Sequence, residues 1–263
     1  MLIPVNAHCA NVARVLKAVE DAVDWENVAD WLLVAASVKS VDLDTIQHDW
    51  DFGYCSSADE FQMSREDLLQ RFVTNISIFT FAWGALEAAL EVIKPPKHAD
   101  KSKGGKIRNA CHYLKGKFES RSSVLHLFEE VSNFRSAAQA CFGYEGVEAQ
   151  FRDVTDIGTP GIGLYAVYKL RNSFAHGSLA FPMPDEENRP DSEHAGMVTH
   201  ATRIVLLTLQ MLLLAHFGES NEPVSFAWDR IDLSDESPLW LVLRGCHVEQ
   251  EEESSQLSLL QDA

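Results

Sequence analysis

Cysteine is scarce in this 263-residue chain, and its few copies are scattered rather than grouped. No two of them are spaced as CxxC and their number is odd, so the pattern indicates neither a zinc ribbon nor a disulfide framework. Disulfides persist mainly in oxidising compartments, and reduced thiols in the cytoplasm are therefore the simplest interpretation. The cysteines are Cys9, Cys55, Cys111, Cys141 and Cys246.

A leader and a long uninterrupted apolar run are also missing. The opening stretch MLIPVNAHCANVARVL has no basic region followed by a continuous apolar segment, so we expect no signal peptide. The longest apolar run, residues 204–217, contains polar side chains and is shorter than a bilayer crossing requires. We therefore expect a soluble, cytoplasmic protein in which this run forms a buried helix.

Basic residues are few, because 22 lysines and arginines stand against 39 aspartates and glutamates, for a net charge of −17. A general nucleic-acid coat protein carries a broad basic surface, so this balance excludes that class. It leaves RNA open as a substrate, because the charge near a site matters more than the total.

The basic side chains that exist are concentrated between residues 94 and 121, where nine of them face only Asp100 and Glu119. The segment KPPKHADKSKGGKIRN within this stretch is typical of a flexible loop between two helices. Two interpretations stay open: a solvated connector, or an arm that contacts phosphates and loses affinity as salt is added. In the second case the RNA-binding residues are Lys101, Lys103, Lys106 and Arg108.

Apolar residues recur at helical spacing almost throughout the chain, which predicts an all-α fold. The first stripe comprises Val12, Val15, Leu16, Val19 and Val23. After it we expect a long helix from a capping-box-like Ser64 to the Pro95–Pro96 pair, and an amphipathic helix over 123–141 with Phe128 on its apolar side. A third helix is expected from an N-cap at Thr159 to His176, and a last one over about 197–217, which Gly218 closes.

Composition divides the chain into three expected parts. Residues 1–63 form an N-terminal helical extension, residues 64–218 form the helical domain with its basic loop at 94–121, and residues 219–263 form an acidic C-terminal extension. The last part carries eleven acidic and two basic residues, and we expect its end to be mobile. The stretches SFAWDRID and PLWLVLRGCHV within it are compatible with a short β-hairpin.

The segment YKLRNSFAHGSLAFP, residues 168–182, places an arginine, an asparagine and a histidine in the last turns of a predicted helix. Asn172 and His176 share a helix face, while Arg171 lies about 140° around the axis from the histidine. A helix C-terminus favours imidazolium, which suits general acid–base catalysis, and a guanidinium can hold a phosphate through two oxygens. Histidine followed by glycine is also an ordinary helix end, so both interpretations stay open on spacing alone.

The stretch LRNSFAHG resembles the motif of the HEPN domain superfamily, in which a histidine follows an arginine after four to six intervening residues, often with asparagine directly after the arginine. The segment FAWGALEAAL, residues 81–90, is similar to the long helix that often precedes the motif. The resemblance covers roughly residues 64–218 and implies an HEPN-like antiparallel helical bundle. It also implies that Arg171 and His176 are catalytic and that Asn172 supports them.

Many members of that superfamily are metal-independent ribonucleases, among them toxins and antiviral proteins, and the motifs of two protomers face one another across a dimer interface. The resemblance thus implies a homodimer that cleaves RNA endonucleolytically through the ribose 2′-hydroxyl, without a cofactor, in a toxin, phage-defence or stress role. An inhibitor or antitoxin protein is a further implied partner. One toxin branch carries a tyrosine two residues after the histidine, where this chain has Ser178, so a nucleotidyltransferase partner is not supported.

A second interpretation belongs to another class: a non-catalytic HEPN-like module that dimerises and binds a protein partner or a nucleotide. Some members of the superfamily serve only in that way, and the strongly negative net charge favours this alternative, because RNA would have to approach against the overall field. The complete set of Arg171, Asn172 and His176 favours the enzyme.

Other candidates are weaker. Glu87, on the apolar stripe of the long helix, needs a partner, for which Arg171 is a candidate; with Ser173 it is a support residue of the site. An imperfect echo of the motif, Arg108, Asn109 and His112, is best explained by chance. The remaining histidines that stand near cysteine or one another lack the four-ligand spacing of zinc sites, so we interpret them as surface or helix-packing residues; they are His8 beside Cys9, His194 and His200.

Overall fold

Helices dominate the computed structural model, which describes residues 1–48, 53, 55–118, 124–141, 157–184, 193–218, 223–224 and 237–249. The expected all-α fold is confirmed. The helices of the described residues are α1 (Val5–Ala18), α2 (Ala22–Ser37), α3 (Ser56–Ile93), α4 (Lys106–Lys117), α5 (Leu127–Ala140), α7 (Thr159–Ala175), α8 (Glu193–Phe217) and α9 (Leu239–Gly245), with short 3-10 turns at Ile46–His48 and Lys101–Lys103.

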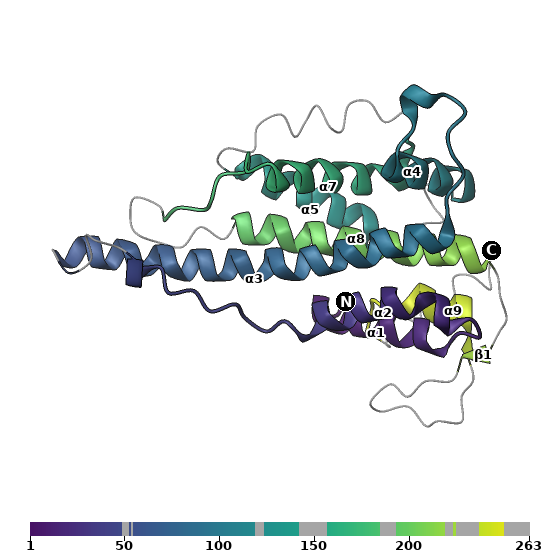
Figure 1. The fold of residues 1–263 in the computed structure, drawn as a ribbon, viewed down its shortest axis with the longest axis horizontal. Helices are drawn as coiled ribbons and strands as arrows, with labels where there is room; N and C mark the ends of the chain where they lie inside the picture. Colours follow the sequence, from purple (N-terminus) through teal and green to yellow (C-terminus); the bar gives the residue numbers. More distant parts are fainter. Residues whose placement is uncertain are drawn as a thin grey trace.

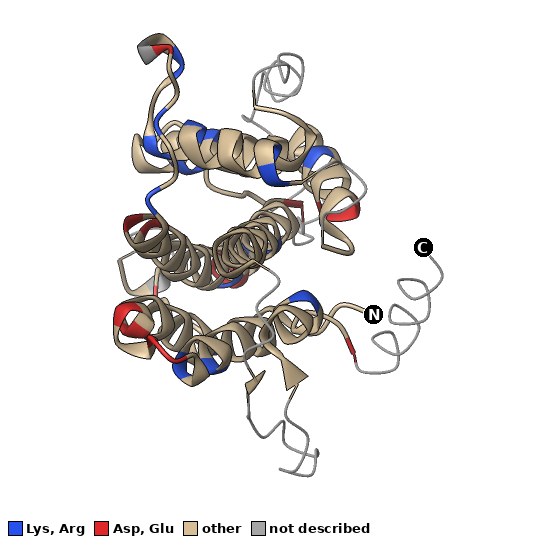
Figure 2. Cartoon of the chain, turned by 90° about the vertical axis from the view of Figure 1, so that its right-hand side faces the viewer, with Lys and Arg blue, Asp and Glu red and all other residues tan. Residues whose placement is uncertain are grey.

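The helices form three layers (Figures 1 and 2). The long helices α3 and α8 run side by side in the middle, α1, α2 and α9 cover one side, and α4, α5 and α7 cover the other. Helix α8 is apolar nearly all round, as a central helix must be, and fifteen of its side chains are buried. It packs against helices of both outer layers, so it lies at the centre of the hydrophobic core.

Helix ends are where the structure differs from the predicted elements. Helix α3 begins at Ser56, so Ser64 lies inside it rather than at its start. Nothing between these positions breaks a helix, since the segment holds neither proline nor glycine. Helix α7 begins at Thr159 itself, after Gly158 as N-cap. The ends at His176 and Phe217 agree with the predicted ones.

Two apolar side chains lie outside the stripes assigned to them. Val23 is 80% exposed, because α1 ends at Ala18 and the chain turns before α2, which restarts the helical phase. Phe128 is 36% exposed in the first turn of α5, where Leu127 and Val131 are buried instead.

The expected N-terminal extension belongs to the same hydrophobic core as the helical domain. Buried residues of α1, α2, α3, α5, α7, α8 and α9 form one contiguous cluster. The start of the chain is held by its far end, because the Ile3 N–H donates to the His247 carbonyl at 3.1 Å and the Glu249 N–H donates to the Met1 carbonyl at 3.0 Å. One core therefore joins the described residues of all three expected parts.

The acidic C-terminal stretch contains a helix that sequence patterning missed. Most of PLWLVLRG forms α9, whose Leu239, Val242 and Leu243 are buried at helical spacing, so the predicted strand there is wrong. A short antiparallel pair does exist, between β1 (Pro223–Val224) and β2 (Ser237–Pro238). The stretch SFAWDRID and the expected mobile end both lie outside the described residues.

By length and composition, α3 and α8 each pass as candidate membrane spans. Within its most apolar window, α8 is 78% buried inside the protein and α3 is 39% buried. The burial of α8 is that of a core helix, as predicted for residues 204–217.

Candidate functional site

The end of α7 is a tightly closed helix terminus. Gly177 adopts the left-handed conformation, with φ of 65°, and its N–H donates to the Phe174 carbonyl at 3.0 Å. The Ser178 N–H and hydroxyl both donate to the Ser173 carbonyl at 2.8 Å. These bonds satisfy carbonyls that a helix end leaves unpaired, and they fix the backbone that carries His176.

None of Arg171, Asn172 and His176 is buried. The first two side chains are half-buried, and His176 is exposed at the C-cap, where its N–H donates to the Asn172 carbonyl at 3.0 Å. Within the described part of the chain, no hydrogen bond or ion pair engages any of the three side chains. Each keeps its full bonding capacity for a ligand, the five guanidinium N–H groups of Arg171 included.

A row of polar and aromatic side chains leads to this helix end along one face of α7. Tyr165, Lys169, Asn172 and His176 follow at intervals of four, three and four residues, which places them on one side of the helix. None of the four is buried, and the row extends for about 16 Å along the axis, from a rise of about 1.5 Å per residue. This face of α7 can therefore lie against an extended ligand.

Tyr165 gathers positive charge at the far end of that row. The Arg108 guanidinium, from α4, lies 5.5 Å from the centre of the Tyr165 ring and donates to its hydroxyl at 3.5 Å. The Lys169 ammonium lies 5.3 Å from the same ring centre. Cations in such positions are attracted by the ring's quadrupole, so Tyr165 holds two of them together. Sequence spacing alone did not single out Tyr165 or Lys169.

Glu87 has a different partner from the one expected. The Trp83 indole N–H, one turn earlier on α3, donates to its carboxylate at 2.8 Å, and no ion pair with Arg171 occurs among the described residues. Trp83 stacks on Tyr168 of α7, with ring centres 6.3 Å apart, and Tyr168 lies one turn before Arg171. Glu87 thus connects to α7 through the stacked rings of Trp83 and Tyr168. Ser173 contributes its carbonyl to the helix end.

The basic segment stands away from His176. Lys101 and Lys103 lie on the short turn of the α3–α4 loop, Lys106 begins α4, and Arg108 faces α7. Figure 2 shows the blue lysines and arginines along this loop, and Figure 1 shows the loop and the end of α7 at opposite ends of their layer. Among the RNA-binding candidates whose side chains the structure describes, Arg108 alone contacts the α7 face.

The echo Arg108, Asn109 and His112 forms no second constellation. Arg108 turns to Tyr165, whereas the Asn109 side-chain oxygen accepts from the His98 N–H at 3.2 Å. His112 stacks on the His98 ring with centres 4.2 Å apart. Arg108 thus has a different partner from Asn109 and His112, which both contact His98, so the three side chains do not meet at one site.

The other histidines noted above are packing residues. His8 and His194 are 1% and 2% exposed, and His200 donates to the buried carboxylate of Glu130 at 2.7 Å. No group of three or more histidine, cysteine, aspartate or glutamate side chains that could hold a metal ion occurs among the described residues.

Comparison with protein-family models, curated proteins and solved structures finds no match to this chain.

Proposed function

We propose that this protein is a metal-independent endoribonuclease of the HEPN type, with Arg171, Asn172 and His176 at its active site. The observation that carries the proposal is a half-buried arginine in the last turns of a hydrogen-bonded helix end that also exposes a histidine, without an acidic partner among the described residues. A half-buried cation in that position favours an anionic ligand, and the phosphodiester of RNA is such an anion.

The cleavage needs only groups that the RNA and these side chains supply. A base removes the proton of the ribose 2′-hydroxyl, the freed oxygen attacks the adjacent phosphorus, and the bond to the 5′-oxygen breaks as an acid gives that oxygen a proton. The products carry a 2′,3′-cyclic phosphate and a 5′-hydroxyl. His176 exchanges the protons, Arg171 stabilises the charge of the pentacoordinate phosphorus, and Asn172 helps to orient the phosphate.

Two proton-transfer roles call for two groups, and each chain brings one copy of the motif. A homodimer in which the two α7 ends face one another supplies a base from one protomer and an acid from the other. This arrangement follows from the resemblance to HEPN proteins, and the exposed face of α7 leaves His176 accessible to a partner chain. The RNA then follows the row from Tyr165 to His176.

The non-catalytic binding module is the second candidate function, and the net charge of −17 favours it. A protein or nucleotide bound at the same helix end would use the same arginine without any bond being broken. The toxin, phage-defence or stress role and the inhibitor partner belong to the first candidate only.

Incubation of an end-labelled RNA with the protein in EDTA separates the two functions. The wild type should cleave it and leave cyclic phosphate ends, and His176→Ala should lower the rate by about 10² to 10⁴, the usual contribution of an acid–base group. Arg171→Ala should lower it by about 10² to 10³, as the loss of a transition-state cation does. His216→Ala is the matched control, because His216 is also an exposed histidine in the last turn of a helix.

The same assay also tests whether the active site is formed by the two α7 ends of a homodimer. When His176→Ala protein is mixed in excess with wild type, mixed dimers should form and activity should fall faster than simple dilution predicts. Cleavage that needs a metal ion, or that survives in His176→Ala, contradicts the proposed mechanism. A folded dimer that cleaves no RNA would favour the second candidate function, the non-catalytic binding module.

A further inference from the structure

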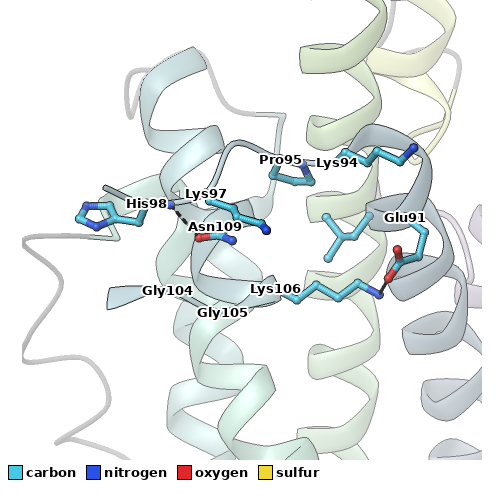
Figure 3. Close-up of a pocket in the computed structure, with 10 residues that line it drawn as sticks. Glu91, Lys94, Pro95, Lys97, His98, Gly104, Gly105, Lys106 and Asn109 are labelled. Atoms are coloured by element: carbon cyan, nitrogen blue, oxygen red, sulfur yellow. Dashed lines mark hydrogen bonds and ion pairs between the residues drawn. The ribbon is translucent and has the colours of Figure 1, made fainter. Parts of the chain in front are cut away.

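A pocket of about 560 Å³ lies between the end of α3 and the start of α4. Its volume is within the range of small-molecule sites. Figure 3 shows its lining: Glu91 and Lys94 come from the end of α3, Lys97 from the loop, and Lys106 and Asn109 from α4. The pocket is open to solvent on one side, and Gly104 and Gly105 form part of its wall.

The charge of this pocket is opposite to that of the chain. Three lysines and one glutamate line it, a net charge of +2 in a protein of net charge −17. Glu91 is already occupied, because the Lys106 ammonium lies 2.7 Å from its carboxylate and lowers the pKa of that carboxyl by hydrogen bonding and by charge. Lys94 and Lys97 form no ion pair with any described residue. The surplus positive charge is therefore left for an anion.

Three side chains direct N–H groups toward the same space. The Asn109 oxygen accepts from the His98 N–H at 3.2 Å, so the amide is oriented with its NH₂ group toward the pocket. Figure 3 shows the Lys97 and Lys106 side chains extending into the gap between α4 and α3, while Lys94 stands at the rim and points outward. A phosphate with its several acceptor oxygens matches two ammonium groups and one amide better than a carboxylate or a neutral ligand does.

The loop that supplies Lys97 is held in place by its own hydrogen bonds. The Asp100 N–H donates to the His98 ring at 3.1 Å, and both the N–H and the hydroxyl of Ser102 donate to the Asp100 carboxylate at 2.9 and 2.7 Å. In the glycine part of the pocket wall, Gly105 has φ of 133°, and a side chain added there would point into open space. The glycine wall leaves the backbone accessible to a ligand.

A second cavity of similar size, about 540 Å³, can be compared with the α3–α4 pocket in its lining and its hydrogen bonds. It lies where α1 meets α3 and α8, and two of its polar side chains are engaged: Asn75 donates to the Ala195 carbonyl and the Thr199 hydroxyl, and Arg203 donates to the Ile3 carbonyl. The α3–α4 pocket differs in having three lysines in its lining, of which Lys94 and Lys97 form no ion pair with a described residue, and an Asn109 amide whose NH₂ group faces the cavity.

We propose that the α3–α4 pocket is a phosphate-binding site, in which Lys97, Lys106 and Asn109 hold a phosphate group of a nucleotide or of an RNA strand. Lys106 exchanges part of its ion pair with Glu91 for the phosphate, and Lys94 adds charge at the rim. The site stands apart from the end of α7, so the proposal does not depend on ribonuclease activity.

Isothermal titration calorimetry at low salt tests it with three probes: inorganic phosphate, AMP, and a DNA oligonucleotide that cannot be cleaved through a 2′-hydroxyl. We expect binding of at least one probe, and about tenfold or greater weakening in Asn109→Asp and in Lys97→Gln, the usual effect of losing one hydrogen bond to a charged group. Asn109→Asp keeps the acceptor for the His98 N–H and changes only the group that faces the ligand.

Lys117→Gln is the matched control, because it removes one positive charge from the last turn of α4, outside the lining. It should change affinity by less than Lys97→Gln does. Binding of phosphate or AMP identifies a small ligand, and binding of the oligonucleotide alone identifies a strand. The proposal is overturned if no probe binds, or if Asn109→Asp and Lys97→Gln bind as the wild type does. RNA cleavage measured in the same variants reports separately on the α7 site.

Discussion

His8 is a buried titratable side chain of α1, and it belongs to a chain of hydrogen bonds between uncharged groups. Its Nε2–H donates to the Gln210 oxygen at 2.5 Å, the Gln210 NH₂ group donates to Nδ1 of His247 at 3.1 Å, and Nε2–H of His247 donates to the Leu125 carbonyl at 3.2 Å. Every donor in this order finds an acceptor only when both imidazoles are neutral. Burial lowers the pKa of His8 to about 3, and the nearby His247 and Arg203 act in the same direction.

This network predicts that the protein loses stability in weak acid. In the unfolded chain His8 takes up a proton below about pH 6.5, whereas in the folded protein it stays neutral down to about pH 3. The unfolded state is therefore stabilised relative to the folded state as pH falls through that interval. Between pH 7 and pH 5 the contribution is about 2 kcal/mol, at about 1.4 kcal/mol for each pH unit. Urea unfolding at the two pH values measures it. The variant His8→Gln keeps an amide donor for Gln210 and should lose less stability by that amount; an equal loss in both proteins would show that His8 does not titrate in this way.

At the scale of elements, two glycines set how closely α7 approaches its neighbours. A Cβ on Gly161 would lie 2.6 Å from the Cys111 Cβ of α4 and 3.0 Å from its Cα, and one on Gly163 would lie 2.7 Å from Val131 of α5. Neither the α4 backbone nor a buried valine can yield easily. The same close packing brings Arg108 to Tyr165, so it also shapes the basic end of the α7 face.

Gly161→Ala should therefore destabilise the protein by about 1 to 3 kcal/mol, the usual cost of overpacking a tight contact. Gly116→Ala is the control on the partner helix α4, since a Cβ there meets nothing within 4 Å. It should stabilise the protein by about 0.5 to 1 kcal/mol, because alanine loses less backbone entropy than glycine in a helix. Urea unfolding compares the two, and equal effects would contradict the close α4–α7 contact.

Local signals predicted some elements well and others poorly for a physical reason. Gly177 and Gly218 both have φ of 65°, and the helices before them end where the sequence indicated, because only a residue without a side chain adopts that conformation freely. The helix start predicted at Ser64 was wrong, because a serine followed by an acidic residue three positions later also fits a helix interior. Tyr165 escaped notice because its partner Arg108 is 57 residues away, and such contacts have no local pattern. The placement of His176 was predictable from the segment alone; whether it catalyses stays a prediction.

At the scale of the whole molecule, one outer layer combines segments that are far apart in the sequence, α1 and α2 with α9 (Figure 1). Asn11 of α1 donates to the Cys246 carbonyl after α9, and Gln210 of α8 donates to the Leu243 carbonyl within α9. Leu2 also pairs with Val248 in an isolated antiparallel bridge. The outer layer of α1, α2 and α9 is thus tied to α8 by buried polar bonds as well as by apolar contact.

These ties predict that the described helices unfold as one cooperative unit rather than as an extension and a domain. Amide hydrogen exchange, followed by mass spectrometry of peptides from α1, α8 and α9, measures this directly, because amides that open only by global unfolding share one high protection. The core amides of α1 and α9 should be protected to about the level of those in α8. The variant Asn11→Ala removes the bond to the Cys246 carbonyl and should lower all three together. Fast exchange confined to α1 and α9, with α8 still protected, would show instead that this layer opens by itself.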